Sequence, residues 1–401
     1  MKIAVWINSG YQPQEGGGFS YFDRLIKAID AYEFDSSLDI CFVTNGSEHI
    51  SLRRKVVYLN ATPKLTLGER IKKRLPLIGW HYQEKCAKRI RHQQICMYHQ
   101  QLKDNEIQLI FYPTSGIVIP NFPSIATNWD IGHLSTYAFP EVAMNGQFEK
   151  RNSYYTTQLP QSLLVFCESE AGKNELLQFT NIKEDKLRVV PIFAGACVDV
   201  QIDAKEQQKI LDQYGLKRHQ FFFYPAQFWA HKNHYTLLNA FKAFRNEHPD
   251  FKLVLTGADH GNKKYVFDLI EKYGLGDSII FPGFVPIETI NTFYQNTSAL
   301  VMASYFGPTN MPPLEAMALG CPILCTDLAG HHEQLADAAL YFDARDKNDL
   351  AKKMRLITLD YDMWHNRVLQ QKECSIFTIE EALKRINQYL IEASIIRSTW
   401  V

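Results

Sequence analysis

Short apolar runs alternate along this chain with longer segments in which apolar positions recur every three or four residues. Each run is apolar throughout, which is typical of a strand buried on both faces of a parallel sheet. The order of strand, turn, helix and strand predicts an α/β protein with right-handed crossovers between doubly wound parallel strands. The expected strands lie at residues 2–7, 38–43, 55–59, 108–112, 124–127, 163–167, 186–191, 220–224, 252–256, 279–281, 299–303 and 323–325.

The segment after the run 299–303 shows this order most clearly. Residues 307–310 read Gly-Pro-Thr-Asn (the GPTN turn), where glycine and proline break the apolar pattern and asparagine can cap a helix. Pro312 and Pro313 fit the first turn of that helix, and Gly320 fits a left-handed stop after it. The GPTN turn is therefore expected at the carboxyl edge of a sheet.

A helix that begins at the GPTN turn can hold an anion. Its N-terminus offers free N–H groups and the positive end of the helix dipole, and phosphate is the usual ligand of such a site. Glu315 follows about one turn later, where a carboxylate can accept hydrogen bonds from two ribose hydroxyls. A solvated Glu315 that only complements the dipole is the alternative.

The length and composition of the chain limit the possible folds and partners further. A chain of 401 residues is too long for one ordinary core and indicates two domains. With 46% hydrophobic and 21% charged residues, it has the composition of a folded globular protein. Its formal net charge is zero, which argues against nucleic acid as a partner and leaves electrostatic specificity to local sites.

Eight cysteines are scattered through the chain without a Cys-x-x-Cys pair. Most lie inside apolar runs, which favours buried reduced thiols in a cytoplasmic protein over a disulfide or metal framework. The run 2–7 is too short for a signal peptide, and no run approaches the roughly 18 residues of a membrane-spanning helix. We therefore expect a cytoplasmic protein, either soluble or peripheral on the inner face of the membrane.

One segment is strongly basic although the whole chain is neutral. Residues 64–91 contain nine Lys and Arg side chains and two Glu side chains, with Leu, Ile and Trp between them. This mixture suits a segment that lies on an anionic membrane surface. A solvated basic helix face is the alternative.

Three consecutive glycines, at 16–18, follow the first strand and precede a helical pattern that starts at Phe19. Glycine lets a backbone approach a ligand closely, so this loop is expected at a binding site, with a plain surface loop as the alternative. The spacing is not that of the Gly-x-Gly-x-x-Gly fingerprint, which argues against an NAD site.

Residues 299–333 resemble the nucleotide-sugar signature of retaining glycosyltransferases of the GT4 class, and the similarity extends from about 221 to 346. The resemblance implies the two-domain GT-B fold. The usual pattern has one Glu on each side of Gly-Phe-Gly-Leu-Pro. Glu315 matches the second Glu, but the GPTN turn replaces Glu-Gly-Phe-Gly, so Gly307 stands where the first Glu contacts the donor sugar. The chain thus resembles a GPTN-type subset of the family.

The resemblance also implies roles for individual residues. Relatives place an Arg and a Lys on the nucleotide diphosphate, where this chain has Gln227 and Lys232. Relatives often have a His-Asp pair near the reacting sugar, where this chain has Trp129 and Asp130, and His133 matches a second His seen in some relatives. The alternatives are a surface lysine at 232 and a structural histidine at 133. The implied catalytic residues are Asp130, His133 and Lys232, and the implied nucleotide-sugar-binding residues are Gly17, Gly18, Gln227, Lys232, Gly257, Phe284, Val285, Pro308, Thr309, Asn310, Met311 and Glu315.

The GT-B resemblance implies an acceptor domain at 1–195, a nucleotide-sugar domain at 208–375, and a last helix, about 376–401, that returns to the first domain. The segment 193–208 would connect the domains. The implied reaction moves a sugar, with retained configuration, from a nucleotide-diphosphate sugar to a saccharide or lipid-linked acceptor in bacterial surface polysaccharide or lipopolysaccharide synthesis. No metal or other cofactor is expected, because the sequence has no D-x-D-like carboxylate pair in a suitable turn and no His/Cys ligand cluster. The His-His-Glu run 331–333 is rejected as a metal site, because adjacent side chains would point to different sides.

Two other functions fit the same pattern. A sugar-nucleotide epimerase of GT-B architecture would share the phosphate-binding turns but would need no acceptor and no basic membrane face. A non-catalytic GT-B partner, which binds a nucleotide sugar or a polysaccharide enzyme, is supported by the replaced Glu, Arg and His positions at Gly307, Gln227 and Trp129. Hydrolysis of a donor sugar without acceptor would count against this last function.

Overall fold

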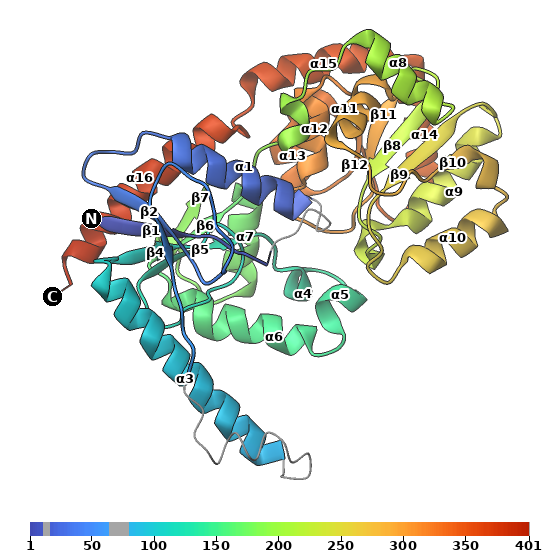
Figure 1. The fold of residues 1–401 in the computed structure, drawn as a ribbon. Helices are drawn as coiled ribbons and strands as arrows, with labels where there is room; N and C mark the ends of the chain where they lie inside the picture. The colour runs from blue at the N-terminus through green and yellow to red at the C-terminus, as the bar shows by residue number, and fades with distance from the viewer. Residues whose placement is uncertain (11–16, 64–79, 401) are drawn as a thin grey trace.

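The computed structural model describes residues 1–10, 17–63 and 80–400, and their strands form two parallel sheets (Figure 1). The first domain is built on a seven-stranded sheet in the order β3-β2-β1-β4-β5-β6-β7. Its first strand lies inside the sheet and later strands extend it in both directions, as in doubly wound folds. These strands are β1 (Lys2–Trp6), β2 (Asp39–Thr44), β3 (Val56–Tyr58), β4 (Leu109–Phe111), β5 (Ser124–Asn128), β6 (Leu164–Cys167) and β7 (Leu187–Val189).

The second domain is built on a six-stranded sheet in the order β10-β9-β8-β11-β12-β13. It starts again from a central strand, so the prediction of α/β architecture with two doubly wound sheets is confirmed. Its strands are β8 (Phe221–Pro225), β9 (Lys252–Thr256), β10 (Ile279–Ile280), β11 (Ala299–Met302), β12 (Ile323–Thr326) and β13 (Ala339–Phe342).

Helices connect the strands and cover the sheets (Figure 1). In the first domain they are α1 (Gly17–Ala31), α3 (Trp80–Asp104), α4 (Gly132–Ser135), α5 (Pro140–Ala143), α6 (Gln147–Ser153) and α7 (Glu170–Phe179). The later helices are α8 (Ala204–Gln213), α9 (His234–Arg245), α10 (Lys263–Lys272), α11 (Ile287–Asn296), α12 (Met311–Ala318), α13 (Ala329–Leu335), α14 (Lys347–Leu359), α15 (Tyr361–Cys374) and α16 (Ile379–Ser398). Short turns of other helix types are η2 (Tyr154–Gln158), η3 (Leu159–Gln161), η4 (Glu184–Lys186), η5 (Ala196–Asp199), η6 (Ala230–Lys232), η7 (Gly276–Ser278) and η8 (Ala336–Ala338).

The side chains of β1 alternate between the two faces of the first sheet. Ile3 and Val5 belong to one hydrophobic cluster, and Ala4 and Trp6 belong to another. All four side chains are buried. A strand covered on both faces must be apolar throughout, which explains why continuous apolar runs predicted the strands of this chain.

Three features differ from the sequence-based expectations. Helix α1 begins at Gly17, so Gly17 and Gly18 lie in a helix and not in a loop. The expected connection 193–208 contains the start of α8, because Asp203 caps that helix by accepting backbone N–H groups of its first turn. Strand β13 was not predicted, since alanines precede and begin its short apolar run and favour a helix.

The last helix packs on the first domain. Helix α15 packs against α12 of the second domain, whereas α16 contacts α1. Nε of Arg188 in β7 donates to Glu392 of α16 at 2.9 Å, and the Asn387 side chain accepts the N–H of Asp35 at 3.0 Å. Figure 1 shows the red end of the chain beside its blue beginning. The chain therefore crosses between the domains twice.

Candidate active site

The GPTN turn joins β11 to α12 at the carboxyl edge of the second sheet. The helix begins at Met311, with Asn310 in the N-cap position and Pro312 in the first turn, as predicted. Gly307 (φ 122°) and Gly320 (φ 71°) have the left-handed backbone conformation that favours glycine. The predicted limits of this helix are therefore confirmed.

The side chain of Asn310 does not cap α12, contrary to expectation. Its Oδ1 accepts a hydrogen bond from Nζ of Lys232 at 3.2 Å, and its Nδ2 lies 3.0 Å from Nε2 of His331. The N-terminus of α12 thus keeps its N–H groups free of this side chain, although Pro312 and Pro313 have none to offer. An anion at this point would be held mainly by the charge of Lys232 and by the dipole of α12.

Lys232 ends the 3₁₀ turn η6, which follows β8. Asn233 comes next in a left-handed conformation (φ 56°) and caps α9 with its side chain. The Tyr224 hydroxyl holds the turn by donating to the carbonyl oxygen of Lys232 at 2.5 Å. The structure therefore brings together Lys232 and Asn310, which lie on different strand exits.

Lys232 is half-buried and remains a cation at neutral pH. Burial lowers the pKa of its ammonium group to about 8, while the carboxylates of Asp130 and Glu141 act in the opposite direction. A bound anion would stabilise the charged form. A lysine at a helix N-terminus suits a diphosphate group.

Two residues of α13 hold the GPTN turn in place. Gln334 bonds both backbone groups of Asn310: its Oε1 accepts the N–H at 3.3 Å, and its Nε2 donates to the carbonyl at 2.9 Å. Gly330 lies so close to the turn that a Cβ there would stand 1.5 Å from the carbonyl oxygen of Pro308. Sequence reasoning missed the roles of Gln334 and His331, although their spacing of three residues puts both on one helix face.

His331 is fully buried on α13. Its Nδ1 lies 2.7 Å from the carbonyl oxygen of Thr326, and burial lowers the pKa of the ring to about 4. The ring is therefore neutral at pH 7. The neighbouring His332 is half exposed and lies 2.7 Å from the carboxylate of Asp327. The two histidines point to different sides of the helix, as expected from adjacent positions.

The first domain contacts the same turn. The Thr309 hydroxyl donates to Oε2 of Glu168 at 2.5 Å, and Oγ of Ser169 donates to the carbonyl oxygen of Pro308 at 3.4 Å. Glu168 is buried, and burial raises its pKa to about 8. Ser169 also caps α7 by accepting the N–H of Gly172. Both domains therefore contribute to the walls of the candidate site.

Two further contacts tie the domains together beside this turn. The Glu333 carboxylate accepts the N–H groups of Glu170 and Ala171 at the start of α7, both at 2.8 Å. On the other side, Glu141 of α5 accepts the backbone N–H of His231 at 2.9 Å and also bonds its ring Nδ1. These pairs were not predicted, because they depend on how two separate folding units face each other.

Glu315 is buried in α12 and has a partner within the second domain. The Tyr294 hydroxyl donates to its Oε2 at 2.7 Å, and burial raises the pKa of the Glu315 carboxyl. A Cβ at Gly195 would stand 2.4 Å from Oε1 of Glu315, and one at Gly17 would stand 2.9 Å from Cε of Met311. The backbone of the first domain thus approaches α12 closely at two glycines. The ribose contact of Glu315 stays a prediction.

Asp130 and His133 follow the end of β5. Asp130 accepts the N–H of Gly132 at 2.9 Å and pairs with Arg151, a residue that sequence reasoning missed. His133 is 7% exposed, and neither of its ring nitrogens has a hydrogen-bond partner among the described residues. Burial lowers the pKa of the His133 ring to about 4. A neutral imidazole in this state can bond a ligand hydroxyl.

The exits of β8 and β9 touch each other beside Lys232. Oε1 of Gln227 accepts the backbone N–H of the residue after Gly257 at 2.5 Å. Gly257 itself (φ 153°) packs so closely that a Cβ there would stand 2.2 Å from the carbonyl oxygen of Ala226. After β10, the Phe284 side chain is 76% exposed, whereas Val285 is buried. The predicted roles of these residues in nucleotide binding are not tested by their positions alone.

The basic segment 64–91 lies partly outside the described residues, which resume at 80. Helix α3 runs away from the first sheet in Figure 1, and Lys85, Lys88 and Arg91 on it are exposed. Contact with a membrane surface stays a prediction. Within 17–63 and 80–400, no helix is both long and apolar enough to span a bilayer.

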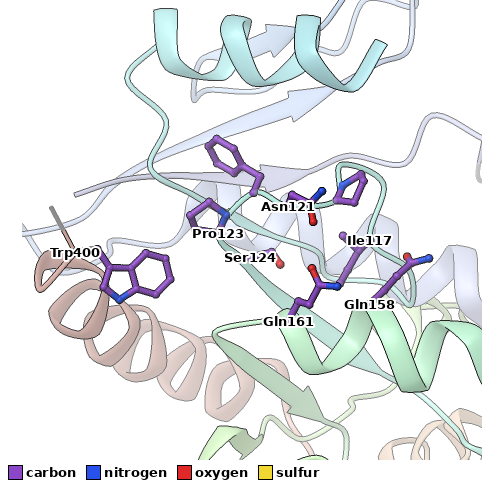
Figure 2. A pocket seen from close by; sticks show the side chains of 9 residues that line it. Ile117, Asn121, Pro123, Ser124, Gln158, Gln161 and Trp400 are labelled. Carbon is purple, nitrogen blue, oxygen red and sulfur yellow. The ribbon is translucent and has the colours of Figure 1, made fainter. Parts of the chain in front are cut away.

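Two pockets lie at the opposite, amino edge of the first sheet. One, of about 260 Å³, is lined by Ser124 at the start of β5 and by Asn121, Gln158, Gln161 and Trp400, among others (Figure 2). Among the residues that the structure describes, no charged side chain lines this pocket, so they offer no counter-charge for a diphosphate there. The other, of about 750 Å³, includes the first residues of β1 and β2. Both pockets lie at the other ends of the strands from the candidate site.

Part of the chain resembles known proteins in sequence. Residues 206–372 match the family model described as glycosyl transferases group 1. The chain is similar to O-antigen chain mannosyltransferase B of Escherichia coli, with 23% identity over 232 residues that cover 58% of this chain and 60% of that protein.

Solved structures resemble the whole chain. Sucrose-phosphate synthase from Thermosynechococcus elongatus superposes with a TM-score of 0.72 at 16% identity, over 98% of this chain and 99% of that one. The Anabaena protein HepE, in complex with UDP-glucose, superposes with a TM-score of 0.69 at 16% identity, over 98% of this chain and all of that one (100%). The chain therefore has the two-domain GT-B fold, and the similarity to group 1 glycosyl transferases lies in residues 206–372.

Proposed function

We propose that this chain is a retaining glycosyltransferase of the GT4 class, which moves a hexose from a nucleoside-diphosphate sugar to a saccharide or lipid-linked acceptor. The observation that carries the proposal is the contact between Lys232 and Asn310 at the N-terminus of α12, at 3.2 Å. It puts a cation and a helix dipole at one point, as stabilisation of a leaving diphosphate requires. The name of the Escherichia coli relative supports a role in surface polysaccharide synthesis and makes mannose the first sugar to test.

The proposed chemistry makes use of this placement. The bond between the anomeric carbon and the diphosphate oxygen breaks, and a bond to the acceptor oxygen forms on the same face of the sugar. The acceptor proton passes to an oxygen of the leaving diphosphate. Lys232 stabilises the negative charge that develops there, so we expect no requirement for a metal ion.

The other predicted residues would bind the rest of the donor. Glu315 would accept the ribose hydroxyls, and the peptide around Phe284 and Val285 would hold the nucleobase. Asp130 and His133 would orient the sugar from the first domain, because His133 has two ring nitrogens without partners among the described residues. The acceptor would bind the first domain, with the segment 64–91 drawing a lipid-linked acceptor to the site from an anionic membrane.

A ligand screen tests the proposal. Purified protein is heated with UDP, GDP, dTDP, CMP and ADP and their common sugar conjugates, with and without EDTA. One nucleoside diphosphate should raise the melting temperature equally in both conditions, because a ligand that binds only the native state stabilises it. The matching sugar conjugate and an acceptor should then yield a product whose anomeric configuration, measured by NMR, is that of the donor. No shift with any ligand, or inversion of configuration, would contradict the proposal.

A non-catalytic nucleotide-sugar-binding partner is the second candidate. It is favoured by Gly307 and Gln227, which stand where relatives have a Glu and an Arg. Binding of a nucleotide sugar without transfer or hydrolysis would support this second function. Transfer to any acceptor would exclude it.

A further inference from the structure

We infer that His331 is a positioning residue, which fixes the orientation of the Asn310 amide and thereby holds the Lys232 ammonium group at the N-terminus of α12. The inference rests on the proposed function, because it assigns His331 to the diphosphate site. His331 itself is fully buried, with 0% exposure, and would touch no substrate. Its effect on the reaction would pass entirely through two other side chains.

The direction of each hydrogen bond follows from the chemistry of the groups. The carbonyl oxygen of Thr326 can only accept, so Nδ1 of His331, 2.7 Å away, carries the proton. Nε2 of the neutral ring is then an acceptor, and the Asn310 atom 3.0 Å from it is the amide nitrogen. Oδ1 of Asn310 therefore faces Nζ of Lys232 at 3.2 Å, and an ammonium group can only donate. The three hydrogen bonds form together only if Nδ1 of His331 carries the proton and the amide nitrogen of Asn310 faces Nε2.

The same groups disfavour the flipped amide. A flip would place Oδ1 of Asn310 against the acceptor nitrogen of His331 and its NH₂ group against the Lys232 ammonium. Protonation of His331 would remove this preference, since Nε2 would then donate. Burial lowers the pKa of His331 to about 4, and the charges of Lys232 and His332 act in the same direction. The acceptor is therefore kept throughout the neutral range.

Residues of helix α13 bond both the backbone and the side chain of Asn310. Gln334 bonds its backbone, and His331 bonds its side chain. Both residues are 0% exposed. If either side chain moved, water could not easily reach the site to replace the lost hydrogen bonds. A lysine side chain has considerable rotamer freedom, and a fixed acceptor reduces the number of positions that its ammonium group can take.

Several titratable groups face Lys232. Asp130 and Glu141, from the first domain, raise its pKa, and burial lowers it to about 8. His231 and His234 flank it on its own segment, and burial lowers their pKa values to about 4 and about 3. Both histidines are therefore neutral above pH 6. Within this cluster, Lys232 should titrate between pH 7 and 9. Glu168, which bonds Thr309 of the GPTN turn, has a pKa raised by burial to about 8, but it is common to both variants compared below and so does not distinguish them.

Two substitutions at position 331 separate the two bonds of the ring. A glutamine can place an acceptor near the position of Nε2, whereas an asparagine reaches only the position of Nδ1 and can keep the bond to Thr326. Both remove the aromatic ring and should cost similar stability. The pair therefore isolates the acceptor that faces Asn310.

The experiment measures binding by calorimetry between pH 6 and 9, with inorganic pyrophosphate and with the nucleoside diphosphates UDP, GDP, dTDP and ADP as probes. His331→Asn should bind the ligands about tenfold more weakly than His331→Gln, the effect of losing one hydrogen bond to a charged group. In His331→Asn the loss of affinity with rising pH should begin at lower pH, because Lys232 has lost its oriented acceptor. His331→Gln should keep the pH profile of the wild type.

Equal affinities and equal pH profiles of the two variants would overturn the inference, since a merely structural ring would affect both alike. Wild-type protein that binds none of the probes would instead contradict the proposed function. NMR of wild-type protein labelled at its histidines gives a second test, which does not require a His331 variant that folds and binds the probes. The His331 ring should carry its proton on Nδ1. Its signal is assigned by its loss in His331→Gln. If that variant does not fold, the signal is assigned through its coupling to labelled Thr326. A proton on Nε2 would overturn the inference.

Discussion

The carbonyl oxygen of Pro308 lies 1.5 Å from the position that a Cβ on Gly330 would take. The GPTN turn and α13 must therefore move apart to accept any side chain at position 330. We expect Gly330→Ala to lower the free energy of unfolding by about 2 kcal/mol, as overpacking of a rigid contact does. Because the same shift displaces Asn310, the affinity for the nucleoside diphosphate should also fall. Urea denaturation and calorimetry measure the two effects.

Gly276→Ala is the matched control. Nothing lies within 4 Å of a Cβ at that position, which is also in the second domain. It should change stability by less than about 0.5 kcal/mol. If Gly330→Ala behaved like this control, the contact with Pro308 would not constrain the turn.

Lys232→Ala should impair turnover far more than folding. Removing one donor that stabilises developing negative charge typically costs a factor of about 10²–10³ in rate. Folding stability should change little, because the lost contact to Asn310 is offset by removal of a partly buried charge. The exposed Lys205 of α8 provides the control, since Lys205→Ala removes the same charge away from the site. An unchanged rate in Lys232→Ala would refute the assigned role.

The wild-type enzyme should lose activity as the pH rises through about 8, the pKa of Lys232 in the folded protein. Above this value the ammonium group loses its proton and its attraction for the diphosphate. A bound ligand favours the charged form, so the decline in kcat should lie at higher pH than the decline in kcat/KM. Initial rates at saturating donor concentration report kcat, and those at low donor concentration report kcat/KM. A flat profile from pH 7 to 9.5 would show that the charge of Lys232 is not used.

Glu315→Gln should weaken binding of a nucleoside diphosphate by about tenfold, because an amide accepts hydroxyl hydrogen bonds less strongly than a carboxylate. Inorganic pyrophosphate has no ribose, and its affinity should stay unchanged. Competition calorimetry with both ligands distinguishes a ribose contact from a general loss of structure. Equal weakening of both would mean that Glu315 supports α12 through Tyr294 and does not bind ribose.

Glu168 should make folding stability depend on pH. Burial raises its pKa from the usual 4.5 to about 8, so between these values the folded state holds a proton that the unfolded state has lost. The contribution of Glu168 to stability therefore falls as the pH rises from about 4.5 to about 8. Glu168→Gln cannot ionise and can still accept the hydrogen bond from Thr309.

Relative to the wild type, we expect Glu168→Gln to gain more than about 1 kcal/mol of stability between pH 5 and pH 8. Urea denaturation at both values measures this, and the comparison cancels the other titrating groups that the two proteins share. A difference in stability that did not vary with pH would show that Glu168 titrates normally.

Local patterns predicted most of the strands and the ends of α12. Proline at 312 and glycine at 320 restrict the backbone whatever surrounds them, so their effect can be predicted from sequence. The same reasoning failed for the side chain of Asn310. The Asn310 amide could bond either the N–H groups of α12 or neighbouring side chains. In the structure it contacts Lys232 and His331.

The relationships between the domains could not be predicted in this way. Thr309 bonds Glu168, which is 141 residues away, and His231 bonds Glu141, 90 residues away. No periodicity or spacing links such pairs, because they exist only once two separately folded sheets meet. The resemblance to a family predicted a set of site residues, but not which of them already have protein partners.

Because α16 returns to the first domain after α15 has packed on the second, the first domain is made of two separate pieces of chain, whereas the second is one internal segment. A hybrid enzyme that keeps one acceptor domain and borrows another donor domain must therefore be spliced twice, once before α8 and once between Cys374 and Ile379. A single splice would leave a foreign helix against Arg188. Exchange of donor specificity between relatives of this chain would accordingly take an internal segment, and the segments on its two sides would be inherited together.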